Sequence, residues 1–476
     1  MNWKSIIDEI ESDENKARKA EHEKRYRVYN DYQRDYVLKM LTNEFSPSTV
    51  RDMRTLTSIN LTKRCIDEMA SIYKRKPVRN FVDATEEQKI GIDKLYQEAN
   101  VDSILKRANQ KFKLHEQCCI QVIPKDGGIY LRVLSPHQYD VVPMPGNPEF
   151  AYAYIISTYN KMIADSTISN NQDIQGNYYG SKNEQASDGV NQQIADKDDY
   201  IQTQKQYVVW TAQDNFVLNS KGQVITQEKN PIGMLPFIDV ACDKDFEFWI
   251  RRGSGICDFN LDFSVVLSDT VNTNRLQSYS QPVIVAEAIP ESVTVGPQNI
   301  LFLPLDPTRP EMKPSFEFAN PNPDMKASLD LLDKLISYFL TSRGISPKTI
   351  SGDASTEKFT SGVERLLAMI ERFEASQSDI DLFLSVEDQL FILMQAWYNQ
   401  INGTDMLEPE YAFGSWPEEM ELLVKFLGPE VVQTDADKED SVIKRLDAGL
   451  ISRVEAIAEL RGISVEDAAK VIDSLQ

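Results

Sequence analysis

The stretch ICDFNLDFSVVLSDTVNTNRLQSYS, residues 256–280, decides how this sequence is interpreted. Its apolar and small residues recur at three- and four-residue spacing, which predicts an amphipathic helix. One side of this helix carries Phe259, Phe263, Val266, Thr270 and Thr273. Another side carries the acids Asp258, Asp262 and Asp269. We therefore expect a helix that packs on one face and presents negative charge on another.

A second amphipathic helix is predicted over residues 323–343, because Asn322 before Pro323 is a typical helix start. Asp330 and Lys334 are expected to face away from its apolar side. That side comprises Leu329, Leu332, Ile336, Phe339 and Leu340. The intervening residues, 281–322, are rich in proline and indicate strands and turns. Two helices are thus predicted to flank a small β-containing excursion.

A polar loop over residues 344–362 follows, rich in glycine, serine and threonine. Ser361 followed by Glu364 matches a capping box, which predicts that a long helix spans residues 363–403. Gln377 and Glu387 interrupt the apolar stripe of this helix, so a kink or a partner contact is expected there.

The remainder of the chain predicts an α+β fold. Residues 1–45 resemble a charged helical arm in which Tyr26, Tyr29, Tyr32 and Tyr36 share one face; we interpret them as a packing stripe, with stacking on bases as the alternative. A helix beginning near Ile59 is expected to end at Pro77. Residues 404–476 are predicted to be helical.

Strand patterns dominate the middle of the chain, within residues 46–255. They are CCIQVIP, IYLRVL and AYAYIIS before a polar segment, and QYVVWTA, NFVLN, QVIT and PFIDVAC after it. The polar segment, residues 160–200, has few core-forming residues, and we expect an exposed, mobile insertion.

The net charge limits the classes of function. The chain has 73 acidic and 51 basic residues, which gives a net charge of −22. Proteins that hold duplex DNA by neutralising its phosphates are usually basic, at least locally. This chain is therefore expected either to avoid nucleic acid or to meet it without holding it tightly.

The cysteines and the N-terminus indicate in which cellular compartment the protein is made. Five cysteines with no C-x-x-C pair are interpreted as reduced thiols of a protein made in a cytoplasm. The N-terminus is charged and resembles no signal peptide, and no apolar run reaches the roughly 18 residues that span a bilayer. We expect a protein that is neither secreted nor embedded in a membrane.

Catalytic motifs are not found. The sequence has no P-loop, and its histidines, His22, His115 and His137, show no metal-ligand spacing. The recurring acids of residues 256–280 are of the type that holds a divalent cation in nucleases, but no paired base or histidine accompanies them. No catalytic residue, cofactor or metal is expected.

The order of these elements resembles the portal proteins of tailed bacteriophages, the head-tail connector rings. The resemblance rests on that order together with the short motifs TSGVE (360–364), INLTKRCIDEMASIYKRKPV (59–78), VLSPHQYDVV (133–142) and RLDAGLISRVEAIAELRGISVEDA (445–468). It implies a wing over residues 46–255, stem helices over 256–280 and 323–343, a clip over 281–322, a tunnel loop over 344–362, a long wing helix over 363–403 and a crown over 404–476.

The resemblance also implies a function. Portal proteins form a dodecameric ring at one capsid vertex of the virion, and genome DNA is packaged and ejected through its channel. The implied partners are further copies of the chain, double-stranded DNA, an ATP-driven large terminase, the major capsid protein and a head-tail adaptor, without a membrane; the protein would be made in the host cytoplasm.

The resemblance assigns roles to particular residues. The tunnel loop would bring Lys348, Ser351, Thr356 and Lys358 to DNA. The channel would be lined by the acids Asp258, Asp262, Asp269 and Asp330, whose charge would keep the phosphates from binding. Two alternatives stay open: another oligomeric phage structural or adaptor protein, and a metal-dependent nucleic-acid enzyme.

Overall fold

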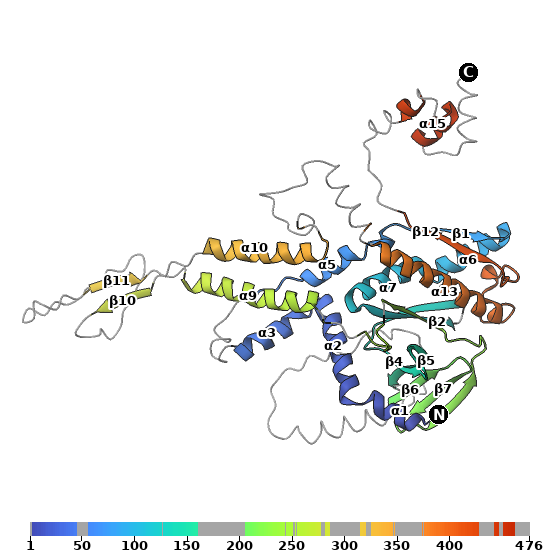
Figure 1. Ribbon diagram of the computed structural model, residues 1–476, viewed down its shortest axis with the longest axis horizontal. Coiled ribbons are helices and arrows are strands. Elements are labelled where there is room, and N and C mark those ends of the chain that lie inside the picture. The colour runs from blue at the N-terminus through green and yellow to red at the C-terminus, as the bar shows by residue number, and fades with distance from the viewer. Residues whose placement is uncertain are drawn as a thin grey trace, which may run out of the picture. The chain divides into compact units, whose positions relative to one another are not determined.

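Helical and strand patterns alternate along the chain, and the computed structural model has the α+β fold that they predict (Figure 1). It describes residues 2–44, 56–159, 205–277, 281–285, 315–319, 325–347, 374–427, 442–446 and 451–461, except 126, 243, 251, 252, 254, 346 and 375. The chain divides into two units, residues 1–356 with 374–427 and residues 357–373 with 428–476. The second unit contains α15 (Arg453–Arg461), which Ser452 and Glu455 cap by reciprocal hydrogen bonds.

Three helices begin the first unit: α1 (Trp3–Ile10), α2 (Asp13–Tyr29) and α3 (Gln33–Glu44). The backbone turns between α2 and α3, where Asp31 has a φ of 69°. The prediction that the four tyrosines share one helix face is therefore wrong, because Tyr26 and Tyr29 lie on α2 and Tyr36 lies on α3.

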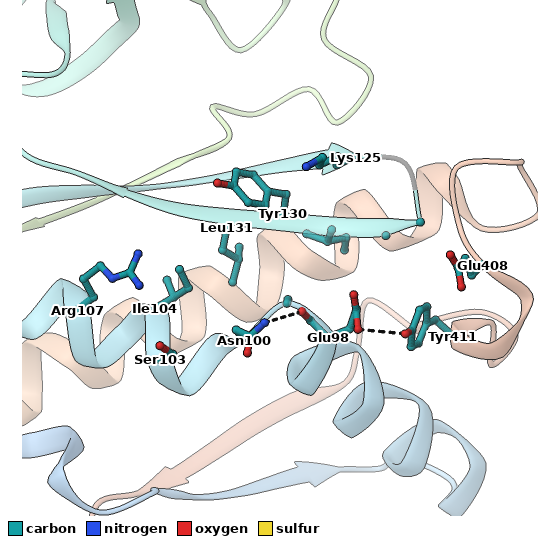
Figure 2. Close-up of a pocket in the computed structure, with 14 residues that line it drawn as sticks. Glu98, Asn100, Ser103, Ile104, Arg107, Lys125, Tyr130, Leu131, Glu408 and Tyr411 are labelled. Carbon is teal, nitrogen blue, oxygen red and sulfur yellow. Dashed lines mark hydrogen bonds between the residues drawn. The ribbon is translucent and has the colours of Figure 1, made fainter. Parts of the chain in front are cut away.

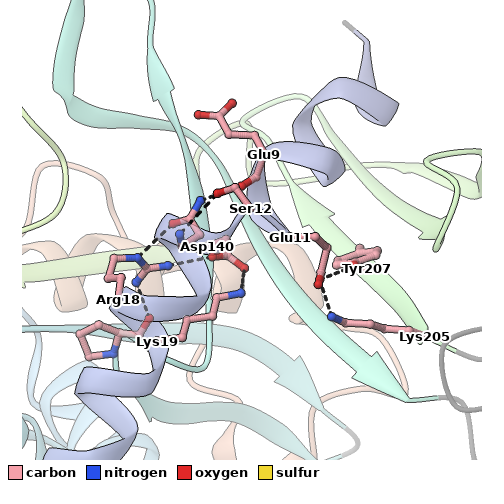
Figure 3. Close-up of polar contacts among 10 residues, drawn as sticks. Glu9, Glu11, Ser12, Arg18, Lys19, Asp140, Lys205 and Tyr207 are labelled. Carbon is pink, nitrogen blue, oxygen red and sulfur yellow. Dashed lines mark hydrogen bonds and ion pairs between the residues drawn. The ribbon is translucent and has the colours of Figure 1, made fainter. Parts of the chain in front are cut away.

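Ion pairs connect the first two helices to the neighbouring sheet (Figure 3). Asp140 accepts from Arg18 at 2.8 Å and from Lys19 at 2.5 Å, and it is buried. Glu11, at the end of α1, pairs with Lys205 at 2.5 Å. The charged residues of this helical segment thus hold it to the body of the protein.

Three α-helices, one 3₁₀ helix and one strand come next in the described part of the chain, before the strands of the two larger sheets. They are α5 (Leu61–Met69), the short 3₁₀ helix η1 (Ile72–Lys74), α6 (Glu86–Glu98) and α7 (Val101–His115), with strand β1 (Val78–Val82) between η1 and α6. The helix predicted to reach Pro77 instead ends at Met69, where Ala70 leaves the helical conformation.

Two antiparallel sheets follow. The first has the strand order β3-β2-β9, and the second has the order β4-β5-β6-β7-β8. Their bounds are β2 (Gln117–Lys125), β3 (Gly128–Leu134), β4 (Asp140–Met144), β5 (Asn147–Tyr159), β6 (Lys205–Trp210), β7 (Asp214–Asn219), β8 (Val224–Lys229) and β9 (Phe237–Ala241). These strands confirm the strand patterns of the sequence. The insertion predicted over 160–200 lies outside the described residues, between β5 and β6.

The three-stranded sheet packs against α7 and α13 (Gln377–Ile401). On α13, Trp397 donates from Nε1 to the carbonyl of Val122 in β2 at 2.8 Å. Ser376 occupies the N-cap position of α13, and the predicted capping residues Ser361 and Glu364 lie outside the described residues.

One strand corrects the prediction of an all-helical C-terminal segment. Strand β12 (Glu421–Lys425) pairs antiparallel with β1, and Val78 lies opposite Lys425. Residues 404–427 belong to the first unit, because their partners are β1, α6 and α13. The prediction that the whole of 404–476 forms a helical crown is therefore wrong for this part.

The sequence from Ile256 to Gln277 is helical, as predicted. It forms α9 (Gly255–Gln277), and the return helix is α10 (Met325–Ser342). Between them, β10 (Gln281–Val285) pairs antiparallel with β11 (Ser315–Ala319), so the excursion contains a two-stranded sheet.

Candidate functional site

The helix pair α9–α10 is the part of the structure to which the sequence assigned a function. Figure 1 shows the two helices side by side. Phe259 near the start of α9 stacks on Phe339 near the end of α10, with ring centroids 3.8 Å apart and an interplanar angle of 3°. Phe263 and Leu332 pack in the same cluster. The two helices are thus antiparallel and joined by an apolar seam.

A second face of α9 is polar and buried. Asn260, Ser264, Ser268 and Asn272 recur every four residues, and all four are buried. The side chain of Asn260 accepts from the backbone N–H of Leu61 at 2.8 Å. Ser268 bonds to both backbone groups of Thr57, at 3.0 and 2.8 Å. This stripe holds residues 57–61 against α9.

The four-residue spacing of the polar stripe is visible in the sequence. A spacing of four residues places side chains on one helix face, and polar residues on such a face are usually exposed. Here Asn260 and Ser268 bond to backbone groups of Leu61 and Thr57, whereas Ser264 and Asn272 bond to carbonyls within α9, so the buried polar groups find partners. The predicted apolar side of α9 is accordingly correct for Phe259 and Phe263, but Val266 is exposed.

The four acids assigned to the channel do not share one environment. Asp258 is half-buried and pairs with Lys24 of α2 at 2.7 Å. Asp262, Asp269 and Asp330 are exposed. Asp258 therefore contacts α2, and the other three acids differ from it in that their side chains are exposed.

The partner of Asp258 shows the electrostatics of this contact. Burial by itself lowers the pKa of the Lys24 ammonium. The hydrogen bond to Asp258 and the charge of Glu21 outweigh that effect, and the pKa of Lys24 is raised above its usual value. The contact therefore keeps Lys24 charged and joins α2 to the start of α9.

Helix α10 carries a second apolar face that the sequence argument missed. Leu332 and Leu340 are buried toward α9 and α5, as predicted. On an adjacent face, however, Leu331, Leu335 and Tyr338 are 54%, 39% and 72% exposed. Their spacing, i, i+4 and i+7, forms one stripe along the helix. We call these three residues the outer stripe.

Several predicted residues cannot be placed. Lys348, Ser351, Thr356 and Lys358 of the loop predicted over 344–362 lie outside the described residues. Among the described residues, no group of three or more histidine, cysteine, aspartate or glutamate side chains is arranged to hold a metal ion. No helix in the described part of the chain is long and apolar enough to cross a membrane.

Comparison with known proteins gives little. No protein-family model matches the sequence, and no curated protein matches it. Among solved structures, the chain is similar to a chain of the virion of a native gene transfer agent particle, with 12% sequence identity and a TM-score of 0.38. The similarity covers 84% of this chain and 88% of that chain. Similarity at this level assigns no function.

Proposed function

We propose that this chain is the subunit of a phage portal, a ring of copies at one capsid vertex through which genome DNA is packaged and ejected. The observation that carries the proposal is the outer stripe of α10. An antiparallel helix pair that buries one apolar face within its own chain leaves Leu331, Leu335 and Tyr338 exposed on a second. Contiguous exposed apolar residues mark surfaces of association.

We take the partner of the outer stripe to be a second copy of this chain, since the other apolar face of α10 is already covered within the chain. Copies of α9–α10 packed side by side in a ring bury the outer stripe of each copy. Full burial of a large apolar side chain contributes about 1.5–3 kcal/mol. Because the three residues are already partly covered, the stripe contributes about 3 kcal/mol per contact. Contacts of this size are weak singly and become effective when a ring closes.

The charge of the helix pair supports a channel for DNA. Asp262, Asp269 and Asp330 are exposed on it, in a chain of net charge −22. A wall of the same sign as the phosphates lowers the affinity for DNA, so that the duplex slides without being held. In this proposal a large terminase drives the DNA, the major capsid protein surrounds the ring, and a head-tail adaptor docks on it.

Electron microscopy of the purified chain tests the ring. We expect a closed ring with a central hole, and we expect Leu331→Glu combined with Tyr338→Glu to give monomers that retain the helical circular-dichroism spectrum. Lys334→Ala, an exposed change between the stripe residues in sequence, is the matched control and should leave the ring intact. A chain that is monomeric at every concentration and in assembled particles would refute the proposal.

A packaging assay tests the channel. Replacing Asp262 and Asp269 with lysine should slow the passage of DNA, because each new cation adds a phosphate contact. Unchanged packaging would remove these two residues from the channel wall. An oligomer without a central hole would favour a different phage structural protein, and Mg²⁺-dependent cleavage of plasmid DNA would favour an enzyme.

A further inference from the structure

All three histidines of the chain meet at one place, although they come from three separate segments. His22 lies on α2, His115 ends α7, and His137 lies in the connection between β3 and β4. The Nδ1 atoms of His22 and His115 are 3.3 Å apart. The rings of His115 and His137 form a T-shaped pair, with centroids 6.1 Å apart. We call these three residues the histidine cluster.

The contacts of the histidine cluster require neutral rings. His22 and His115 are 6% and 1% exposed. Because one Nδ1 atom donates and the other accepts, at least one of these two rings lacks a proton on Nδ1, so the two cannot both be charged while they are in contact. In the described part of the chain, the buried atoms Nε2 of His115 and Nδ1 of His137 have no hydrogen-bond partner, and an added proton there would therefore be costly.

Cations surround the histidine cluster. Those that act on it are Arg18, Lys19 and Arg25 of α2 and Lys111 of α7. The acids and other titratable groups of the elements packed there are Glu21 and Tyr26 of α2, Glu116 after α7, Asp140 of β4, and Cys257 and Asp258 of α9. Three of these acids pair with cations: Glu21 with Arg25, Asp140 with Arg18 and Lys19, and Asp258 with Lys24. Burial first, and then the surrounding positive charge, lowers the pKa of all three histidines.

The first half of α7 has different surroundings. It lines a pocket of about 460 Å³ between α7 and the β2–β3 hairpin (Figure 2). The lining includes the acids Glu98 and Glu408 as well as the cations Arg107 and Lys125. A histidine placed at Ser103, another residue of this lining, would lie among charges of both signs, and this position therefore supplies a control on the same helix.

Polar contacts attach α2 to the rest of the protein. Three of its seventeen residues are buried, His22, Arg25 and Val28, and of these only Val28 is apolar. Its ion pairs and hydrogen bonds reach Asp67 of α5, His115 of α7, Asp140 of β4 and Asp258 of α9. A helix without a broad apolar face gains little from the hydrophobic effect, so the attachment of α2 depends on the charge of these groups. Its neighbours α1 and α3, by contrast, bury apolar side chains.

We propose that α2 is an acid-sensitive clasp, which detaches from α7 and β4 when the histidine cluster takes up protons. The docked helix holds the rings in a site that opposes their charge, whereas the released helix exposes them to water. Each histidine that is neutral when docked, and that has its ordinary pKa of about 6.5 when released, raises the released population about 25-fold between pH 7 and pH 5. Asp140 acts in the opposite direction, because burial raises its pKa and a falling pH then favours its docked form.

Hydrogen exchange measured by mass spectrometry on the full chain tests the clasp. A detached helix of this length is marginally stable in water, so its amides become exchangeable. After correction for the intrinsic pH dependence of exchange, the amides of α2 should exchange faster at pH 5 than at pH 7, by about 25-fold for each histidine that titrates. The amides of α13 should keep their protection at both pH values.

Histidine variants assign the effect to the cluster. His22→Gln and His137→Gln should each lower the ratio of the α2 exchange rates at pH 5 and pH 7 by about 25-fold, because each removes one titrating group. The effect of Asp140 is common to these variants and the unmodified chain, so it cancels in the comparison. Ser103→His, which adds a histidine to the pocket lining of α7, should leave the ratio unchanged.

A permanent charge gives a readout that does not depend on pH. His22→Lys should release α2 already at pH 7, whereas His22→Gln, which also lacks the imidazole but stays neutral, should leave it more protected. Glu23→Lys, at the adjacent exposed position, is the matched control and should leave α2 protected.

Three outcomes would overturn the clasp. The first is equal acceleration of exchange in α2 and α13 at pH 5, because the whole chain would then be unfolding. The second is a pH ratio that changes in neither His22→Gln nor His137→Gln. The third is an α2 in His22→Lys that is as protected at pH 7 as in His22→Gln.

Discussion

A buried ion pair between η1–β1 and α13 gives a stability prediction whose size follows from the structure. The Glu387 side chain is fully buried and accepts from Nε and Nη2 of Arg79, at 2.9 and 2.8 Å. It also accepts from the Tyr73 hydroxyl at 3.1 Å. Burial lowers the pKa of Arg79, but its bonds to Glu387 and Asp102 outweigh this and raise it.

Removing Arg79 should cost more than removing Glu387. Arg79→Met leaves a buried carboxylate with the Tyr73 hydroxyl as its remaining hydrogen bond, and breaking a buried pair in this way costs about 3–5 kcal/mol. Glu387→Leu leaves Arg79 with Asp102, which is partly exposed, at 2.6 Å. We expect a cost near the low end of that range, about 3 kcal/mol.

The double variant Arg79→Met with Glu387→Leu removes both charges, so it should be more stable than Arg79→Met alone. Urea unfolding followed by tryptophan fluorescence measures these differences, because Trp397 on α13 reports the packing of that helix. Two results would contradict the reasoning: a change below about 1 kcal/mol in Arg79→Met, or a double variant whose cost equals the sum of the single costs.

Three further predictions concern packing, capping of backbone groups and pH. Phe339→Ala removes one ring of the α9–α10 stack and should lower the free energy of unfolding by about 3 kcal/mol in thermal or urea unfolding; no change would mean that the helices do not depend on this seam. Asn260→Ala removes the side-chain acceptor of the Leu61 N–H, which keeps its bond to the Ile59 carbonyl at 3.1 Å, and should cost about 1 kcal/mol, with faster hydrogen exchange at that amide as the specific signature. Burial, and then neighbouring cations, lower the pKa of His22 to about 3 and of His137 to about 4. The two histidines therefore take up protons at a higher pH in the unfolded chain than in the folded protein, so the free energy of unfolding should fall as pH drops from about 6.5 to about 4. His137→Gln should reduce the slope of the free energy of unfolding against pH by up to about 1.4 kcal/mol per pH unit. An unchanged slope would exclude His137 as a titrating group.

Local sequence determined the elements of this protein. Three- and four-residue periodicity located α9 and α10, and alternation located the strands of the two larger sheets, because side-chain direction repeats every 3.6 residues in a helix and every two in a strand. Breaks in backbone conformation were harder to predict. The turn at Asp31 depends on one positive φ, which periodicity does not signal; the local signal is the residue type, since Asn and Asp adopt this conformation more readily than most residues.

Tertiary structure alone decided which faces are covered and by what. Strand β1 pairs with β12 more than three hundred residues later, and no turn connects the two. Part of the polar stripe of α9 is buried against residues 57–61, and α9 and α5 cover one face of α10 while the outer stripe stays exposed. Periodicity is a property of neighbours along the chain, whereas burial depends on segments that the whole fold brings together. The sequence therefore predicted the helix pair, and only the tertiary structure decided which of its faces are buried and which are exposed.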